Sequence, residues 1–115
     1  MSPLNGEITF DAGGRSYRLV LGFNALCAAE VQTGKRWSDI MADAQSGSPS
    51  VIRVLFWAGL RKHHPEVTVD GAGDLIDAVG MGRAGELVAT AVTSAFPPTE
   101  GAGPLAASRK AGKRS

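Results

Sequence analysis

The sequence predicts an α+β fold, mostly α: an N-terminal two-stranded β-hairpin packed on about five short helices, followed by a disordered C-terminal tail. Three observations predict this fold. The 115 residues are 43% apolar and 20% charged, which is enough material for one compact domain and not for two. Apolar residues first alternate with polar ones, as in strands, and then recur every three or four residues, as in helices. A basic segment rich in Pro, Gly and Ala ends the chain.

The hairpin is predicted from two alternating segments around a glycine-containing turn. The strands cover residues 6–10 and 15–21, and Asp11-Ala12-Gly13-Gly14 between them has the length of a turn that closes a hairpin. Alternation gives each strand one side that faces a core. A two-stranded ribbon is only marginally stable alone, so we expect helices to cover that side.

Two helices are predicted directly after the hairpin. The first runs from residue 23 to residue 33 and ends at Gly34. Its apolar face, expected to pack on the core, consists of Phe23, Leu26, Cys27 and Val31. The second helix is short, with Ser38 as its N-cap and Gln45-Ser46-Gly47 at its end. Its apolar face consists of Trp37, Ile40, Met41 and Ala44.

The third predicted helix is the expected spine of the core. Ser48 and Pro49 supply an N-cap and a proline at the first helical position, and residues 51–60 are apolar nearly all round. A basic end, Arg61-Lys62-His63-His64, suits the helix macrodipole and is stopped by Pro65.

Two further helices complete the predicted domain. Thr68 or Asp70 caps the fourth helix, which ends at Gly80. The fifth stops at Pro97-Pro98. Its apolar residues are Leu87, Val88, Ala91, Val92, Ala95 and Phe96. The predicted domain therefore covers residues 1–96 and the predicted disordered tail covers residues 97–115.

Charge is divided unevenly between this domain and the tail. Residues 97–115 hold four Lys or Arg and one Glu, a net charge of +3, whereas residues 1–96 have a net charge of −2. Leu105 is the sizeable apolar residue of the tail, so burial cannot offset an ordering entropy of about 1 to 2 kcal/mol per residue. Four cations without interleaved aromatic residues favour only weak phosphate contact, so nucleic-acid binding is disfavoured.

The histidines and the cysteine do not form an evident reactive site. His63 and His64 are adjacent and would point about 100° apart on a helix, so we interpret them as a solvated helix end rather than metal ligands. Cys27 lies on a predicted apolar stripe and is expected to pack in the core rather than to act as a nucleophile. A lone cysteine also favours a reducing compartment.

Two further motifs are interpreted as structural. The Gly-x-Gly-x-x-Gly pattern at residues 80–85 follows a predicted helix instead of a strand, so we expect an inter-helix turn and no cofactor site. Asp70, Asp74 and Asp77 share one helix face, which is interpreted as a solvated surface. The sequence thus predicts no catalytic, cofactor or metal site, no small-molecule substrate and no enzyme.

We expect a soluble protein in the cytoplasm of its cell. No segment approaches the roughly 18 to 20 consecutive apolar residues of a membrane span, and the N-terminus lacks the basic start and apolar stretch of a signal peptide. The remaining class is an interaction module, because bulky Trp37, Phe56 and Trp57 on alanine-rich helices are typical partner anchors, although such aromatics also serve as core.

A longer pattern resembles a known family. Residues 54–69, Val-Leu-Phe-Trp-Ala-Gly-Leu-Arg-Lys-His-His-Pro-Glu-Val-Thr-Val, are followed by Gly-Asp-Leu-Ile-Asp at residues 73–77. Gly-Glu-Ile-Thr-Phe at residues 6–10 and Gly-Phe-Asn-Ala-Leu at residues 22–26 precede them. Over residues 6–96 this order resembles the small tail assembly chaperones of long-tailed phages and gene transfer agents. Gly71 departs from the pattern, because an acidic residue there would complete a capping box.

The resemblance implies a non-enzymatic role in the cytoplasm of a bacterial host. Such chaperones coat the helical tape-measure protein and leave as tail tube subunits polymerise, so the protein would be absent from the finished particle. Its partners would be the tape-measure protein, the tail tube protein and further copies of itself. Our hypothesis for the contact surface is Trp37, Ile40 and Met41, with Trp57. The alternatives are a tail tube or head-tail joining component retained in the particle, and a small DNA-binding regulator.

Overall fold

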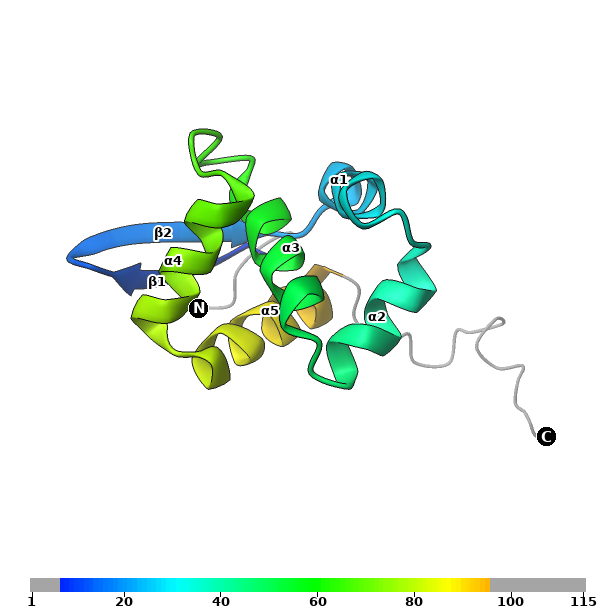
Figure 1. Cartoon of the computed structure of the whole chain (residues 1–115). Coiled ribbons are helices and arrows are strands. Elements are labelled where there is room, and N and C mark those ends of the chain that lie inside the picture. Colours follow the sequence, from blue (N-terminus) through cyan, green and yellow to red (C-terminus); the bar gives the residue numbers. More distant parts are fainter. Residues whose placement is uncertain (1–6, 96–115) are drawn as a thin grey trace.

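The computed structural model describes residues 7–95, which form a β-hairpin followed by five α-helices, with 65% of these residues helical (Figure 1). This architecture confirms the predicted α+β fold dominated by helices. The predicted disordered tail at 97–115, together with Phe96 of the last predicted helix, lies outside the described residues. No helix among residues 7–95 has the length and apolarity needed to cross a membrane.

The hairpin is tighter at its tip than the sequence analysis predicts. Strand β1 (Glu7–Ala12) pairs antiparallel with β2 (Arg15–Val20), and the ladder includes Asp11 and Ala12, which we had expected in the turn. The turn consists only of Gly13 and Gly14, whose φ angles are 58° and 79°. Two glycines accept this left-handed backbone without strain, so two residues are sufficient to reverse the chain.

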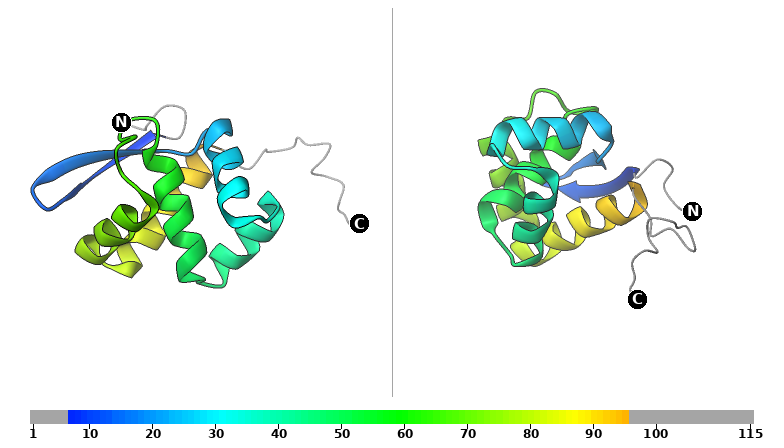
Figure 2. Two further views of the ribbon diagram at one scale, coloured as in Figure 1. Left: turned by 45° about the horizontal axis from the view of Figure 1, so that its top comes forward. Right: turned by 90° about the vertical axis from the view of Figure 1, so that its right-hand side faces the viewer.

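Helix α3 (Pro49–Leu60) lies in the middle of the helices, with α1 (Phe23–Thr33) and α2 (Trp37–Gln45) on one side and α4 (Val69–Val79) on the other (Figures 1 and 2). Its Leu55, Phe56 and Leu60 are fully buried, which confirms the predicted spine of the core. The hairpin packs on α3 through its inward face, where the Phe10 ring lies 5.2 Å from the Phe56 ring. The absence of a side chain at Gly59 allows α3 and β2 to approach each other closely, because a Cβ there would lie 2.8 Å from Cδ2 of Leu19.

Helices α1 and α2 are joined by a cap that spans the two. Gly34 ends α1 with a φ of 72°, as predicted. The N-cap of α2 is Arg36 and not Ser38, which lies inside the first turn. The carboxylate of Glu30 on α1 accepts the N–H of Trp37 at 2.8 Å and so satisfies a donor at the start of α2.

Thr68 is the cap of α4, and its Oγ1 accepts the N–H of Gly71 at 2.9 Å. Gly80, with a φ of 95°, separates α4 from α5 (Met81–Ala95). The expected inter-helix turn is therefore present only at Gly80, and its extension over residues 81–85 is wrong, because α5 begins at Met81 and contains the next two glycines of the motif. Burial of Ala84 in the first turns of α5 favours helix over turn at these residues.

Candidate partner-binding surface

Helix α1 turns its larger apolar side chains to solvent. Phe23 is 76% exposed, Val31 is 85% exposed, and Cys27 is also exposed. The buried side of the helix consists of Ala25 and Ala29 instead. The expectation that Phe23, Leu26, Cys27 and Val31 pack in the core is therefore wrong for three of these residues, and Leu26 is half-buried.

The physical reason is the close approach of α1 to its neighbours. Alanine side chains allow two helices to pack with little separation, whereas a phenylalanine in the same position would hold them apart. The exposed side chains lie at every fourth residue, so they form one line along the outside of the helix, about 12 Å long. We call Phe23, Cys27 and Val31 the α1 face.

The α1 face is bordered on one side by a hollow against α3. The hollow has a volume of about 530 Å³. Its lining residues are Asn24, Cys27, Ala28, Val31, Gln32, Trp57 and Arg61. The guanidinium of Arg61 lies 5.4 Å from the centre of the Trp57 ring, a cation–π contact that holds both side chains at this edge. A polar and aromatic edge thus adjoins an apolar stripe.

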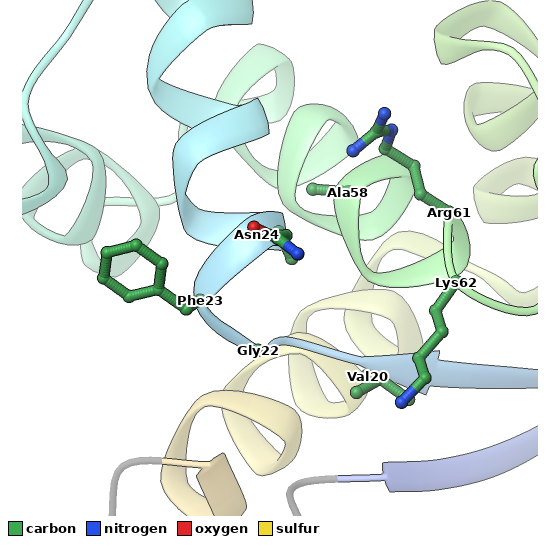
Figure 3. A pocket seen from close by; sticks show the side chains of 8 residues that line it. Val20, Gly22, Phe23, Asn24, Ala58, Arg61 and Lys62 are labelled. Atoms are coloured by element: carbon green, nitrogen blue, oxygen red, sulfur yellow. The ribbon is translucent and has the colours of Figure 1, made fainter.

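A second hollow continues around the start of α1, where Arg61 and Lys62 meet Gly22 and Asn24 (Figure 3). In Figure 3 the two cations extend from the end of α3 on one side of α1, and the ring of Phe23 projects from the other side. Arg61 lines both hollows, so positive charge follows the α3 side of α1.

The residues of our sequence-based contact surface lie in different places. Trp57 is half-buried and lines the hollow beside the α1 face. Met41 is half-buried and lines another hollow, between α2 and α5. Ile40 is 0% exposed, which corrects the hypothesis at this position, because its side chain packs in the core and not on a surface. Trp37 is half-buried against the core at the start of α2.

The histidines do not form the solvated helix end that we expected. His64 is only 8% exposed, and its Nε2 accepts the backbone N–H of Arg18 at 3.1 Å. Burial lowers the pKa of His64 below its ordinary value of 6.5, and the nearby carboxylate of Glu66 opposes that shift. Nε2 of His63 lies 2.9 Å from Oε2 of Glu7. Both histidines therefore tie the connection between α3 and α4 to the hairpin.

The acidic residues of α4 lie as predicted. Asp70, Asp74 and Asp77 are exposed, and Asp70 has Arg53 at 3.6 Å. Within residues 7–95, no group of three or more His, Cys, Asp or Glu side chains is arranged to hold a metal ion.

Comparison of the chain with protein-family models, with curated proteins and with solved structures finds no match.

Proposed function

We propose that this protein is a tail assembly chaperone of a long-tailed phage or gene transfer agent, which binds the tape-measure protein while the tail tube assembles. The observation that carries the proposal is the α1 face. Within residues 7–95, the large hydrophobic side chains that are exposed are Phe23, Val31 and Met81, and the first two belong to this face. Exposed apolar surface that is continuous along a helix is typical of a protein-interaction site.

The sequence resemblance also supports the proposal, and the residues that carry it lie in the interior and at a helix cap of the domain. The motif over residues 54–69 corresponds to most of α3 and its connection to α4, where Phe56 is fully buried, His64 binds the backbone of β2 and Thr68 caps α4. Each of these residues has a structural role in the domain. The resemblance thus rests on residues that build the domain, whereas the proposed binding surface is the α1 face.

Masking of apolar surface is the physical task of such a chaperone. An amphipathic tape-measure helix in water exposes apolar area worth roughly 25 cal/mol per Å², which drives aggregation. The α1 face is short, so one copy contributes a modest contact, and several copies along a rod would repeat that contact. Modest individual contacts allow tube subunits to replace the chaperone as the tube grows.

Co-expression with the neighbouring tail genes tests this function. We expect the tape-measure product to be soluble only when this protein is present. Phe23→Ser should reduce the soluble fraction, whereas Met81→Ser, which changes an exposed apolar residue on α5, should not. Trp37→Ala in the same assay tests the surface that the sequence predicts. Far-UV circular dichroism checks that every variant keeps its fold.

Three results would contradict the proposal or favour an alternative. A tape-measure product that is equally soluble without this protein would refute the chaperone role. Stoichiometric amounts of the protein in finished particles, measured by mass spectrometry, would favour a tube or head-tail joining component. Affinity for DNA that falls steeply with salt would favour a regulator.

A further inference from the structure

We propose that the α1 face and the cations beside it bind an acidic amphipathic helix, whose apolar stripe lies along α1 and whose carboxylates face Arg61 and Lys62. This inference rests on the proposed function for the identity of the partner, a segment of the tape-measure protein. It adds the chemistry that such a segment must have.

The shape of the surface favours a helix as the occupant. Phe23, Cys27 and Val31 repeat once per turn, the spacing that matches the apolar stripe of a second helix. A β-strand is disfavoured on this surface, because strand addition needs a free sheet edge and the backbone of α1 is hydrogen-bonded within the helix. The hollow beside Val31 can receive a side chain from the edge of the incoming helix.

The charges around the surface favour acidic residues on one edge of that helix. Arg61 and Lys62 are exposed, and neither has a carboxylate within 4.0 Å among residues 7–95. Glu30 borders the opposite edge and already accepts the N–H of Trp37. The α3 side of the groove is therefore positive, and a partner with carboxylates there gains orientation and register more than affinity.

A second copy of this chain is a poorer occupant of the same face. Glu30 is the charged residue of α1 and already accepts the N–H of Trp37, so α1 of another copy would bring one partly engaged carboxylate to Arg61 and not a row of acids. Stable dimers bury on the order of 800 Å² per partner. Three side chains over about 12 Å of helix provide much less than that area.

Two synthetic peptides of equal length and equal leucine stripe test the inference, one with Glu and one with Lys along its flank. We expect the full chain to bind the Glu peptide about tenfold more tightly than the Lys peptide at low salt, and the ratio to fall as salt screens the charges. Fluorescence anisotropy of labelled peptide measures both affinities. Phe23→Ser should weaken binding of the Glu peptide several-fold, and Arg61→Glu, which leaves Lys62 beside the new carboxylate, should abolish the preference for the Glu peptide. Arg83→Gln changes an exposed cation on α5 and should leave both affinities unchanged.

Each other outcome overturns the inference. Equal affinity for the two peptides would refute the role of Arg61 and Lys62 in binding the carboxylates. Unchanged affinity of Phe23→Ser for the Glu peptide would refute the α1 face as the binding surface. A concentration-dependent dimer in analytical ultracentrifugation that Phe23→Ser dissociates would assign the face to a second copy.

Failure of the function and failure of the inference give different results. If the tape-measure product stays insoluble although the Glu peptide binds as expected, the function is wrong and the surface chemistry stands. If Phe23→Ser keeps the tape-measure product soluble as well as the unchanged chain does, the function stands and the inference about α1 is wrong.

Discussion

Replacement of Gly59 by alanine tests the close approach of α3 to the hairpin. The added Cβ would lie 2.8 Å from Cδ2 of Leu19 and 3.7 Å from Cδ2 of Leu21, and both leucines are 1% exposed. A carbon–carbon distance of 2.8 Å is well inside van der Waals contact, so Leu19 must move within a filled core. Overpacking of this kind costs about 1 to 3 kcal/mol.

The backbone contribution has the opposite sign and can be measured separately. Alanine stabilises a helix interior by about 1 kcal/mol relative to glycine. Gly85→Ala on α5 is the matched control, because nothing lies within 4 Å of the added Cβ there. We expect Gly85→Ala to be stabilising, and Gly59→Ala to be less stable than that control by about 1 to 3 kcal/mol.

Urea denaturation followed by far-UV circular dichroism measures the difference in free energy of unfolding between the two variants, and an equal m-value shows that the comparison is valid. In a Leu19→Val background, which removes Cδ2, Gly59→Ala should cost less, and the double-mutant cycle gives the coupling. Equal stabilisation by Gly59→Ala and Gly85→Ala would refute the close contact between α3 and β2.

Three further predictions concern the cap of α4, the buried histidine and the orientation of α1. Thr68→Ala removes the acceptor for the N–H of Gly71 and should lower the free energy of unfolding by about 1 kcal/mol in urea, relative to Thr68→Ser; equal stability would refute the cap. Burial lowers the pKa of His64 below 6.5 in the folded state, so below that pH the unfolded chain binds more protons than the folded chain. The contribution of neutral His64 to the free energy of unfolding is therefore complete above pH 6.5 and is lost as the pH falls below 6.5. Urea denaturation at several pH values between about 7 and 5 should show this loss, and the free energy of unfolding of His64→Phe should depend less on pH. An equal pH dependence in the two proteins would show that His64 is not the responsible group. Cys27 should react with a thiol reagent almost as fast in the native protein as in urea, and strong protection would place α1 the other way round.

Local chemistry made much of the fold predictable. Pro49 near the start of α3, Gly34 after α1 and Thr68 before α4 are signals carried by one or two residues, and the structure places all three as predicted. The continuous apolar segment of α3 also determines its own burial, because that helix is apolar nearly all round. Such signals depend on neighbours in the chain and not on the tertiary arrangement.

The orientation of α1 could not be predicted in the same way. The helix has a small apolar side of alanines and a larger apolar side that includes Phe23 and Val31, and its sequence alone does not decide which one faces inward. The alanine side is buried because α1 packs closely on the rest of the domain, and that requirement comes from tertiary structure. Cys27 is exposed for the same reason, because it lies on the side of α1 opposite the buried alanines.

Contacts between distant residues were also beyond the sequence. The hydrogen bond from the backbone N–H of Arg18 to His64 joins residues that are 46 positions apart, and no sequence pattern predicts a contact at that separation. The carboxylate of Glu30 caps a helix to which it does not belong. For the candidate surface, the sequence identified Trp57 at its edge and missed Phe23 and Val31, because a large apolar residue at helical spacing is usually assigned to the interior.

The attachment of α1 through Ala25 and Ala29 separates two properties that most helices combine. The methyl groups on its inner side hold the helix in place, and the bulkier groups on its outer side contribute little to folding. Residues 23, 27 and 31 can therefore be exchanged for other side chains with small changes in stability, usually within about 0.5 kcal/mol. Selection, or an engineer, can alter the outer surface of this helix while the rest of the domain remains constant.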